Sequence, residues 1–199
     1  MNQYNTIGTV FESEALKIKN SKFIGCAVPV SNEKEVKLAL NQIKQKHSSA
    51  SHCCYAYRIG TDSMSTRVND DGEPTNSAGK PILGQILAFN LTNILVVIIR
   101  YYGGKKLGVG GLIAAYRDST KLTLNGSELM VKERITLIEL KFKYHLLNTV
   151  MRIAKQYQLS MTNQVMELDC TVEFKVPHKV LLEVVQKYKT VYGLKINKS

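Results

Sequence analysis

The chain has 199 residues, which is enough for one large domain or two small ones. Hydrophobic residues make up 44% of it, enough for a packed core, and charged residues make up 22%, which is ordinary for a soluble protein. The formal net charge of +11 favours an acidic partner such as RNA or the ribosome. The alternative is a basic soluble protein without such a partner.

The cysteines predict free thiols rather than a disulfide or zinc framework. Cys26, Cys53, Cys54 and Cys170 form no C-x-x-C pair, which argues against a zinc ribbon or a thioredoxin-type motif. Free thiols are typical of a reducing compartment. The N-terminal sequence has no apolar stretch of a signal peptide, and the apolar run at 94–99 is too short to span a bilayer. We therefore expect a cytoplasmic protein with no membrane partner.

The first part of the chain alternates between predicted strands and helices. Strands are expected at residues 6–18, 22–30, 52–59, 64–68 and 94–100. One helix is expected after a Ser31 cap and ends near Lys46, a second follows a Ser77 cap, and a third covers 112–124. The strand at 94–100 does not alternate between apolar and polar residues, so burial of both faces is predicted.

After about residue 131 a second pattern begins. Strands are expected at 135–144, 160–166, 168–176 and 191–196, and helices at 146–157 and from Pro177 to about Tyr188. This β-α-β-β-α-β order is the ferredoxin-like pattern. We therefore predict an α+β protein with two domains, 1–131 and 132–199.

The glycine-rich stretch "VVIIRYYGGKKLGVGG" at 96–111 raises the question of a phosphate-binding loop. It contains no Walker A sequence, and it fails the dinucleotide pattern because Ile113 stands where the third glycine is required. Glycines before a helix, beside Lys105 and Lys106, can nevertheless bind phosphate. A tight turn that needs glycine for its backbone is the alternative.

Several side chains in and near this stretch are candidates for contacts with phosphates or bases. They are basic, aromatic or glycine: Arg58, Arg100, Tyr101, Gly103, Gly104, Lys105, Lys106, Gly108, Gly110 and Gly111. Asp70, Asp71 and Glu73, in the predicted turn "DDGEP", form the only acidic cluster. If this turn meets the glycine-rich loop, the acids would line a pocket and could hold Mg²⁺; turn and cap roles are the alternative.

Catalytic and metal sites are not favoured. His52 and Cys54 share a face of their predicted strand, but two ligands do not make a zinc site, so no metal and no cofactor is predicted. Cys53 or Cys54 beside His52 could act as a thiol nucleophile, with burial of a small thiol as the alternative. No serine–histidine–aspartate set is recognisable, and no catalytic residue is assigned.

Four stretches together resemble the IMPACT/YigZ family: "SKFIGCAVPV", "ASHCCYAYRIG", "NDDGEPTNSAGKPILGQI" and "NILVVIIRYYGGKKLGVGGLIAAYRDST". The resemblance covers residues 6–193 and is most specific between Asp70 and Tyr116. Asn76 departs from the pattern, since many members carry glycine or a small residue there. The positions that match the family motif are Arg58, Asp70, Asp71, Gly72, Glu73, Pro74, Ala78, Gly79, Pro81, Arg100, Tyr101, Gly103, Gly104, Leu107, Gly108, Gly110, Gly111 and Tyr116.

The resemblance implies an architecture. In this family the N-terminal domain has a ribosomal-protein-like α+β fold with a left-handed β-α-β crossover, similar to domain IV of elongation factor G. Bacterial two-domain, YigZ-like members add a ferredoxin-like domain similar to domain V of that factor.

The resemblance also implies a role near translation. Eukaryotic members regulate translation by binding the activator of a starvation-responsive initiation-factor kinase, using both the shared domain and an N-terminal extension that this chain is expected to lack. The leading hypothesis is a cytoplasmic binding or regulatory protein that contacts RNA or the ribosome. The alternatives are a protein-interaction module that regulates a translation-stress factor, and an enzyme with a phosphate-binding pocket.

Overall fold

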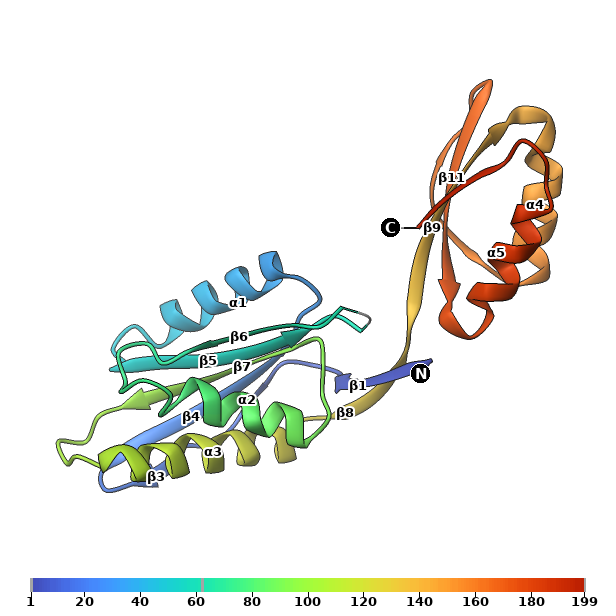
Figure 1. The fold of residues 1–199 in the computed structure, drawn as a ribbon. Coiled ribbons are helices and arrows are strands. Elements are labelled where there is room, and N and C mark those ends of the chain that lie inside the picture. The colour runs from blue at the N-terminus through green and yellow to red at the C-terminus, as the bar shows by residue number, and fades with distance from the viewer. Residues whose placement is uncertain (1, 62, 199) are drawn as a thin grey trace. The chain divides into compact units, whose positions relative to one another are not determined.

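The structure, a computed structural model, describes residues 2–61 and 63–198 (Figure 1). Its contacts divide the chain into two compact units: Tyr4–Lys132, and the chain from Glu133 onward together with Asn2 and Gln3. Both units combine helices with antiparallel sheets, which confirms the mixed α and β fold class. In the described ranges, no helix has the length and apolar character needed to cross a membrane.

The first unit is built on a six-stranded sheet with the order β2-β4-β7-β5-β6, in which β3 also pairs with β4. Because β4 and β5 are both antiparallel to β7, they run parallel to each other, and α1 joins them as a β-α-β crossover. A separate two-stranded sheet pairs β1 with β8. The elements are β1 (Gln3–Ile7), β2 (Phe11–Glu12), β3 (Leu16–Ile18), β4 (Ser21–Pro29), α1 (Glu33–Lys46), β5 (His52–Ile59), β6 (Ser65–Asn69), α2 (Gly79–Ala88), β7 (Ile94–Tyr101), α3 (Gly108–Gly126) and β8 (Leu129–Glu133).

Strand β7 is buried on both faces, as the sequence predicted. Helix α1 covers one face of the sheet, and α2 and α3 cover the other (Figure 1). Successive side chains of a strand point to opposite faces, so β7 contributes alternately to two cores. Ile94, Val96 and Ile98 belong to the core under α2 and α3, whereas Leu95, Val97 and Ile99 belong to the core under α1.

Some predictions for the first unit were wrong in detail. The strand expected at 6–18 is three short strands, β1 to β3. Asn32 rather than Ser31 caps α1: its Oδ1 accepts a hydrogen bond from the Glu35 amide at 3.0 Å, while the Ser31 hydroxyl donates to the Glu35 carboxylate at 2.9 Å. Helix α3 begins at Gly108 instead of Leu112, so the last three glycines of the loop form its first turn.

The second unit has the predicted β-α-β-β-α-β order. Its sheet order is β10-β11-β9-β12, all antiparallel, and α4 and α5 pack on one face (Figure 1). The last strand starts later than expected, because Val191 and Leu194 lie in a turn whose Gly193 has φ +82°. The elements are β9 (Ile135–Lys143), α4 (Leu147–Gln156), β10 (Ser160–Val165), β11 (Asp169–Pro177), α5 (Leu181–Lys189) and β12 (Lys195–Lys198).

Candidate functional site

A cavity of about 500 Å³ opens in the first unit, where the acidic turn meets the end of β7 and the start of α3. The acidic turn and the glycine-rich loop therefore line one pocket, as the hypothesis of a shared pocket requires. The lining includes His52, Glu73, Arg100, Tyr102, Lys106, Gly108 and Val109. A volume in this range suits a small ligand or part of a larger one.

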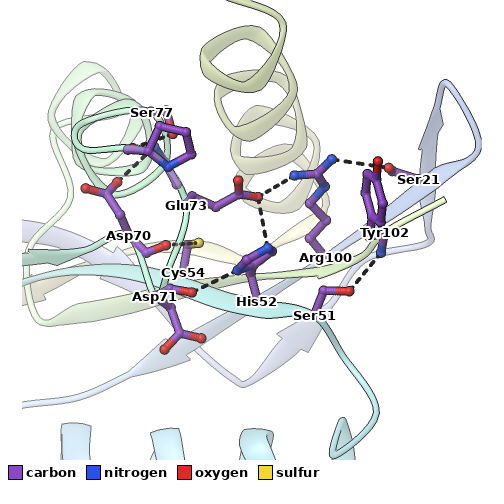
Figure 2. A network of polar contacts seen from close by, with 12 residues as sticks. Ser21, Ser51, His52, Cys54, Asp70, Asp71, Glu73, Ser77, Arg100 and Tyr102 are labelled. Carbon is purple, nitrogen blue, oxygen red and sulfur yellow. Dashed lines mark hydrogen bonds and ion pairs between the residues drawn. The ribbon is translucent and has the colours of Figure 1, made fainter. Parts of the chain in front are cut away.

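A buried ion pair lies at this pocket. Arg100 Nη1 donates to Glu73 Oε1 at 2.6 Å, and the two side chains are only 5% and 4% exposed (Figure 2). The Tyr116 hydroxyl donates to the same carboxylate oxygen at 2.8 Å, and His52 Nε2 lies 3.9 Å from it. Glu73 thus neutralises Arg100, and side chains from three elements, β5, β7 and α3, lie close to its carboxylate.

The thiol of Cys54 is part of this network as a donor. Its Sγ lies 3.3 Å from the Tyr116 hydroxyl and 3.0 Å from the Asp70 carbonyl oxygen. Burial raises the pKa of Cys54 to about 12 and also raises the pKa of Tyr116. Cys54 is therefore a neutral thiol near pH 7, which argues against the thiol-nucleophile interpretation, since the thiolate is the reactive form.

The two tyrosines of the loop point to different places. Tyr102 lines the pocket, is 47% exposed, and has the Arg100 guanidinium carbon 5.3 Å from its ring centroid. Tyr101 lies on the α1 side, where its hydroxyl is 2.9 Å from His47 Nδ1. Alternation along the strand separates them, so only Tyr102 can contact a ligand in this pocket.

The N-terminus of α3 adds positive potential to the pocket. Leu107, its N-cap residue, makes no side-chain cap hydrogen bond, and the first turn contains no acidic residue. The first N–H groups of a helix lack partners within the helix and attract anions. Lys106 lies immediately before this helix on the pocket wall, and the buried Arg100 Nε has no hydrogen-bond partner among the described residues.

The glycines of the loop serve different needs. A Cβ on Gly103 would lie 2.1 Å from the backbone of Asn20, so these two chain segments can pack this closely only because residue 103 is glycine. Gly108 has φ +74°, where residues with a Cβ are rarely found. Gly110, in contrast, has open space around it and an ordinary φ. The tight-turn interpretation therefore explains some of the glycines but not all of them.

Among the three acids, only Glu73 lines the pocket. Asp70 Oδ1 accepts from the amides of Ala78 at 3.0 Å and Gly79 at 2.8 Å, so Asp70 caps α2. The prediction of Ser77 as the cap was wrong, because its hydroxyl donates to the Pro74 carbonyl oxygen instead. Asp71 accepts from the Cys53 amide and pairs with Lys44. The three carboxylates point in different directions (Figure 2) and contact different partners, which disfavours a shared Mg²⁺ site.

Replacing Asp70 with alanine is expected to destabilise the first unit by about 1–2 kcal/mol, because α2 loses its cap. Its Oδ2 also accepts from the Asn76 amide at 2.8 Å, which fixes the turn before the helix. Urea unfolding measures the change. The Asp70→Asn variant keeps one acceptor oxygen and should lose less; equal losses in the two variants would contradict the capping role.

Two of the predicted basic residues lie outside the pocket. Arg58 is near the other end of β5 from His52, where Nη1 donates to the Leu91 carbonyl oxygen at 3.1 Å. Lys105 is exposed but is not part of the described pocket lining.

Two residues of the site have roles that the sequence did not reveal. His52 was considered only as a metal ligand or as the neighbour of a nucleophile, and the role of Tyr116 was missed. The sole available signal for Tyr116 was its place among the family-motif positions.

Comparisons with known proteins place the chain among relatives that share this region. The Impact N-terminal domain model matches residues 19–124. An IMPACT family member from Haemophilus influenzae is 37% identical over 157 residues, covering 78% of this chain and 75% of the relative. IMPACT family member YigZ from Escherichia coli is 34% identical over 136 residues, covering 67% of each chain.

A solved structure, described as the crystal structure of a hypothetical protein, matches the whole fold. It has a TM-score of 0.79 at 26% identity and covers 98% of this chain and 97% of its own. With the family model spanning most of the first unit, and with the bacterial relatives extending over most of the chain, the protein belongs to the IMPACT family.

Proposed function

We propose that this chain is a cytoplasmic binding protein that acts near translation by contacting RNA, free or in the ribosome, through the pocket at the start of α3. The observation that carries the proposal is the convergence of Lys106, the uncapped N-terminus of α3 and the Arg100–Tyr102 stack on one cavity. Each of these groups matches one part of a nucleotide.

The phosphate would lie at the helix N-terminus beside Lys106. Backbone N–H groups and a lysine are the usual partners of a phosphate oxygen. The exposed ring of Tyr102, held by Arg100, offers a surface on which a base can stack. The net charge of +11 would attract the remaining phosphates of an RNA strand.

The architecture supports the same proposal. The β4-α1-β5 crossover and the β-α-β-β-α-β order of the second unit fit the proposed likeness to domains IV and V of elongation factor G. We also propose that the β4-α1-β5 crossover is left-handed and that the boundary between the two domains follows residue 131. An RNA-binding role for such a pair of domains is consistent with the translation role of the family's eukaryotic members.

Replacing Lys106 with alanine is expected to weaken binding of a labelled single-stranded RNA of about 12 nucleotides roughly fivefold at ~0.1 M salt, since one phosphate contact is lost. The slope of log affinity against log salt should fall by about 0.7. Fluorescence anisotropy at several salt concentrations measures both. Lys105→Ala is the matched control, because Lys105 is the exposed neighbour outside the pocket lining, and it should behave like the wild type.

The wild-type affinity should fall roughly 40-fold between about 50 and about 300 mM salt if about three phosphates are contacted. An affinity that does not change with salt, or equal effects of the two lysine variants, would remove this pocket from the RNA interface. In that case a pull-down from cells tests the protein-interaction alternative, because nuclease treatment leaves a direct protein contact intact.

A small phosphorylated substrate is the second candidate ligand. It is favoured by the cavity volume of about 500 Å³ and by the His52–Glu73 pair, whose atoms lie 3.9 Å apart on the cavity wall and could exchange a proton with a substrate. Competition distinguishes the two ligands: a nucleoside monophosphate that displaces the RNA at low micromolar concentration would identify a small-molecule pocket.

A further inference from the structure

Three side chains with metal-binding atoms meet on the α1 side of the sheet, away from the pocket described above. Glu12 and Cys26 are directly opposed in the antiparallel β2–β4 pair, so their side chains lie on the same face. His47 follows the last residue of α1 and its side chain is 7% exposed. Residues distant in the sequence thus offer a carboxylate, a thiol and an imidazole to one place.

The distances between these atoms suit a shared ligand. Cys26 Sγ lies 3.4 Å from Glu12 Oε2, His47 Nε2 lies 3.7 Å from that oxygen, and all three atoms are within 4.8 Å of one another. Zinc bonds of about 2.0–2.3 Å in a tetrahedron separate neighbouring ligand atoms by roughly 3.3–3.7 Å. Two of the three separations already fall in this range.

The histidine ring is held with one nitrogen directed at the cluster. His47 Nδ1 lies 2.9 Å from the Tyr101 hydroxyl, whereas His47 Nε2 is buried and has no hydrogen-bond partner among the described residues. Buried polar atoms without a partner are rare and require an explanation. A metal-binding histidine typically uses its second nitrogen in this way, to bind a group that fixes the ring.

We propose that Glu12 Oε2, Cys26 Sγ and His47 Nε2 bind a divalent transition metal, with Zn²⁺ as the best match to a mixed oxygen, sulfur and nitrogen set. A fourth position remains for water. The metal would link the edge strand β2 to the C-terminal end of α1. The backbone carbonyl groups at that end of the helix also favour a cation.

Lys46 pairs with the same carboxylate oxygen that the metal would use. Its Nζ lies 2.5 Å from Glu12 Oε2, and its side chain is 61% exposed, so it can turn into solvent when a metal arrives. Lys46 therefore competes with the metal for Glu12. Removing this lysine should strengthen metal binding, an effect that binding to one of the other thiols of the chain would not show.

The test is a titration of the full chain, freed of metal with a chelator, with Co²⁺ and then Zn²⁺. Cobalt–thiolate coordination gives a charge-transfer absorption, and Zn²⁺ should abolish it at one equivalent. Cys26→Ser and His47→Gln should each weaken binding at least tenfold, since changes to second-shell groups alone cost roughly 10–100-fold. Cys53→Ser is the matched control, because Cys53 is a buried thiol in the same core but outside the cluster.

Lys46→Ala is the variant expected to fold even if the changes at buried Cys26 and His47 do not, because it alters an exposed side chain. It should bind Co²⁺ several-fold more tightly than the wild type. Absence of the charge-transfer absorption at one equivalent, an unchanged affinity in Cys26→Ser, or weaker binding in Lys46→Ala would each overturn the proposal.

Discussion

The Glu73→Gln variant is expected to lose about 3–5 kcal/mol of unfolding free energy in the first unit, because it leaves the buried guanidinium of Arg100 without a counter-charge. The carboxylate also accepts a hydrogen bond from the Tyr116 hydroxyl at 2.8 Å, so a second buried contact weakens in the variant. Hydrogen exchange of the β7 amides measures the unfolding free energy of this unit alone. The loss should appear as faster exchange along the whole strand.

Two further variants separate the charge effect from a simple loss of packing. Combining Glu73→Gln with Arg100→Met removes both charges and should recover part of the loss, because no unpaired ion remains. Asp118→Asn, which breaks the exposed Arg117–Asp118 pair, should change the unfolding free energy by less than about 1 kcal/mol. A Glu73→Gln effect as small as that of Asp118→Asn would show that the buried pair is not a structural element of the site.

The Gly103→Ala variant is expected to destabilise the first unit by about 3 kcal/mol or more, because its Cβ would overlap the Asn20 carbonyl group at 2.1 Å. The contact is with backbone at the start of β4, so the clash cannot be relieved by rotating a side chain. Gly103 also donates its N–H to Ser21 Oγ at 3.2 Å, which fixes the two chain segments together. Hydrogen exchange or urea unfolding reports the loss.

Gly110→Ala is the matched control within the same loop. Its Cβ would meet open space in the first turn of α3, so alanine should stabilise the helix by about 0.5–1 kcal/mol. If Gly103→Ala proved as stable as Gly110→Ala, the close approach of β4 and the loop would be wrong. RNA binding of the stable Gly110→Ala protein then reports whether a ligand needs that side of the helix open.

Much of the fold could be predicted from the sequence because its signals are local. The unbroken apolar run of β7 predicted that both of its faces are buried. The bounds of β5 could be predicted because polar residues border its run of strand-forming residues. The start of α3 could not be predicted in the same way, because glycines argue against a helix and the packing of Leu112, Ala115 and Tyr116 overrides them. Similarly, a serine before a helix looks like a cap until tertiary contacts give that role to Asp70.

The candidate site was predicted in part. The sequence placed Arg100 and Lys106 in or beside the glycine-rich loop and suggested that this loop meets the acidic turn. In the structure Glu73 pairs with Arg100 and lines the same pocket as Lys106. The sequence could not show that Arg58 lies outside the pocket. Nor could it show that the carboxylates of Asp70 and Asp71 accept hydrogen bonds from backbone amides. Which end of a strand a residue occupies relative to a distant turn depends on strand order, which no local pattern records.

By itself, the sequence determined the α+β composition, the β-α-β-β-α-β order of the second unit and the basic charge, since these depend on residue type and short-range periodicity; the family followed from the resemblance of four motif stretches. Only the tertiary structure decided which polar groups share a site. The Arg100–Glu73 pair joins residues 27 positions apart. The proposed metal ligands Glu12, Cys26 and His47 come from two strands and a helix end. Sheet pairing and helix packing create both groupings, because they bring chain segments together across distances that sequence spacing does not encode.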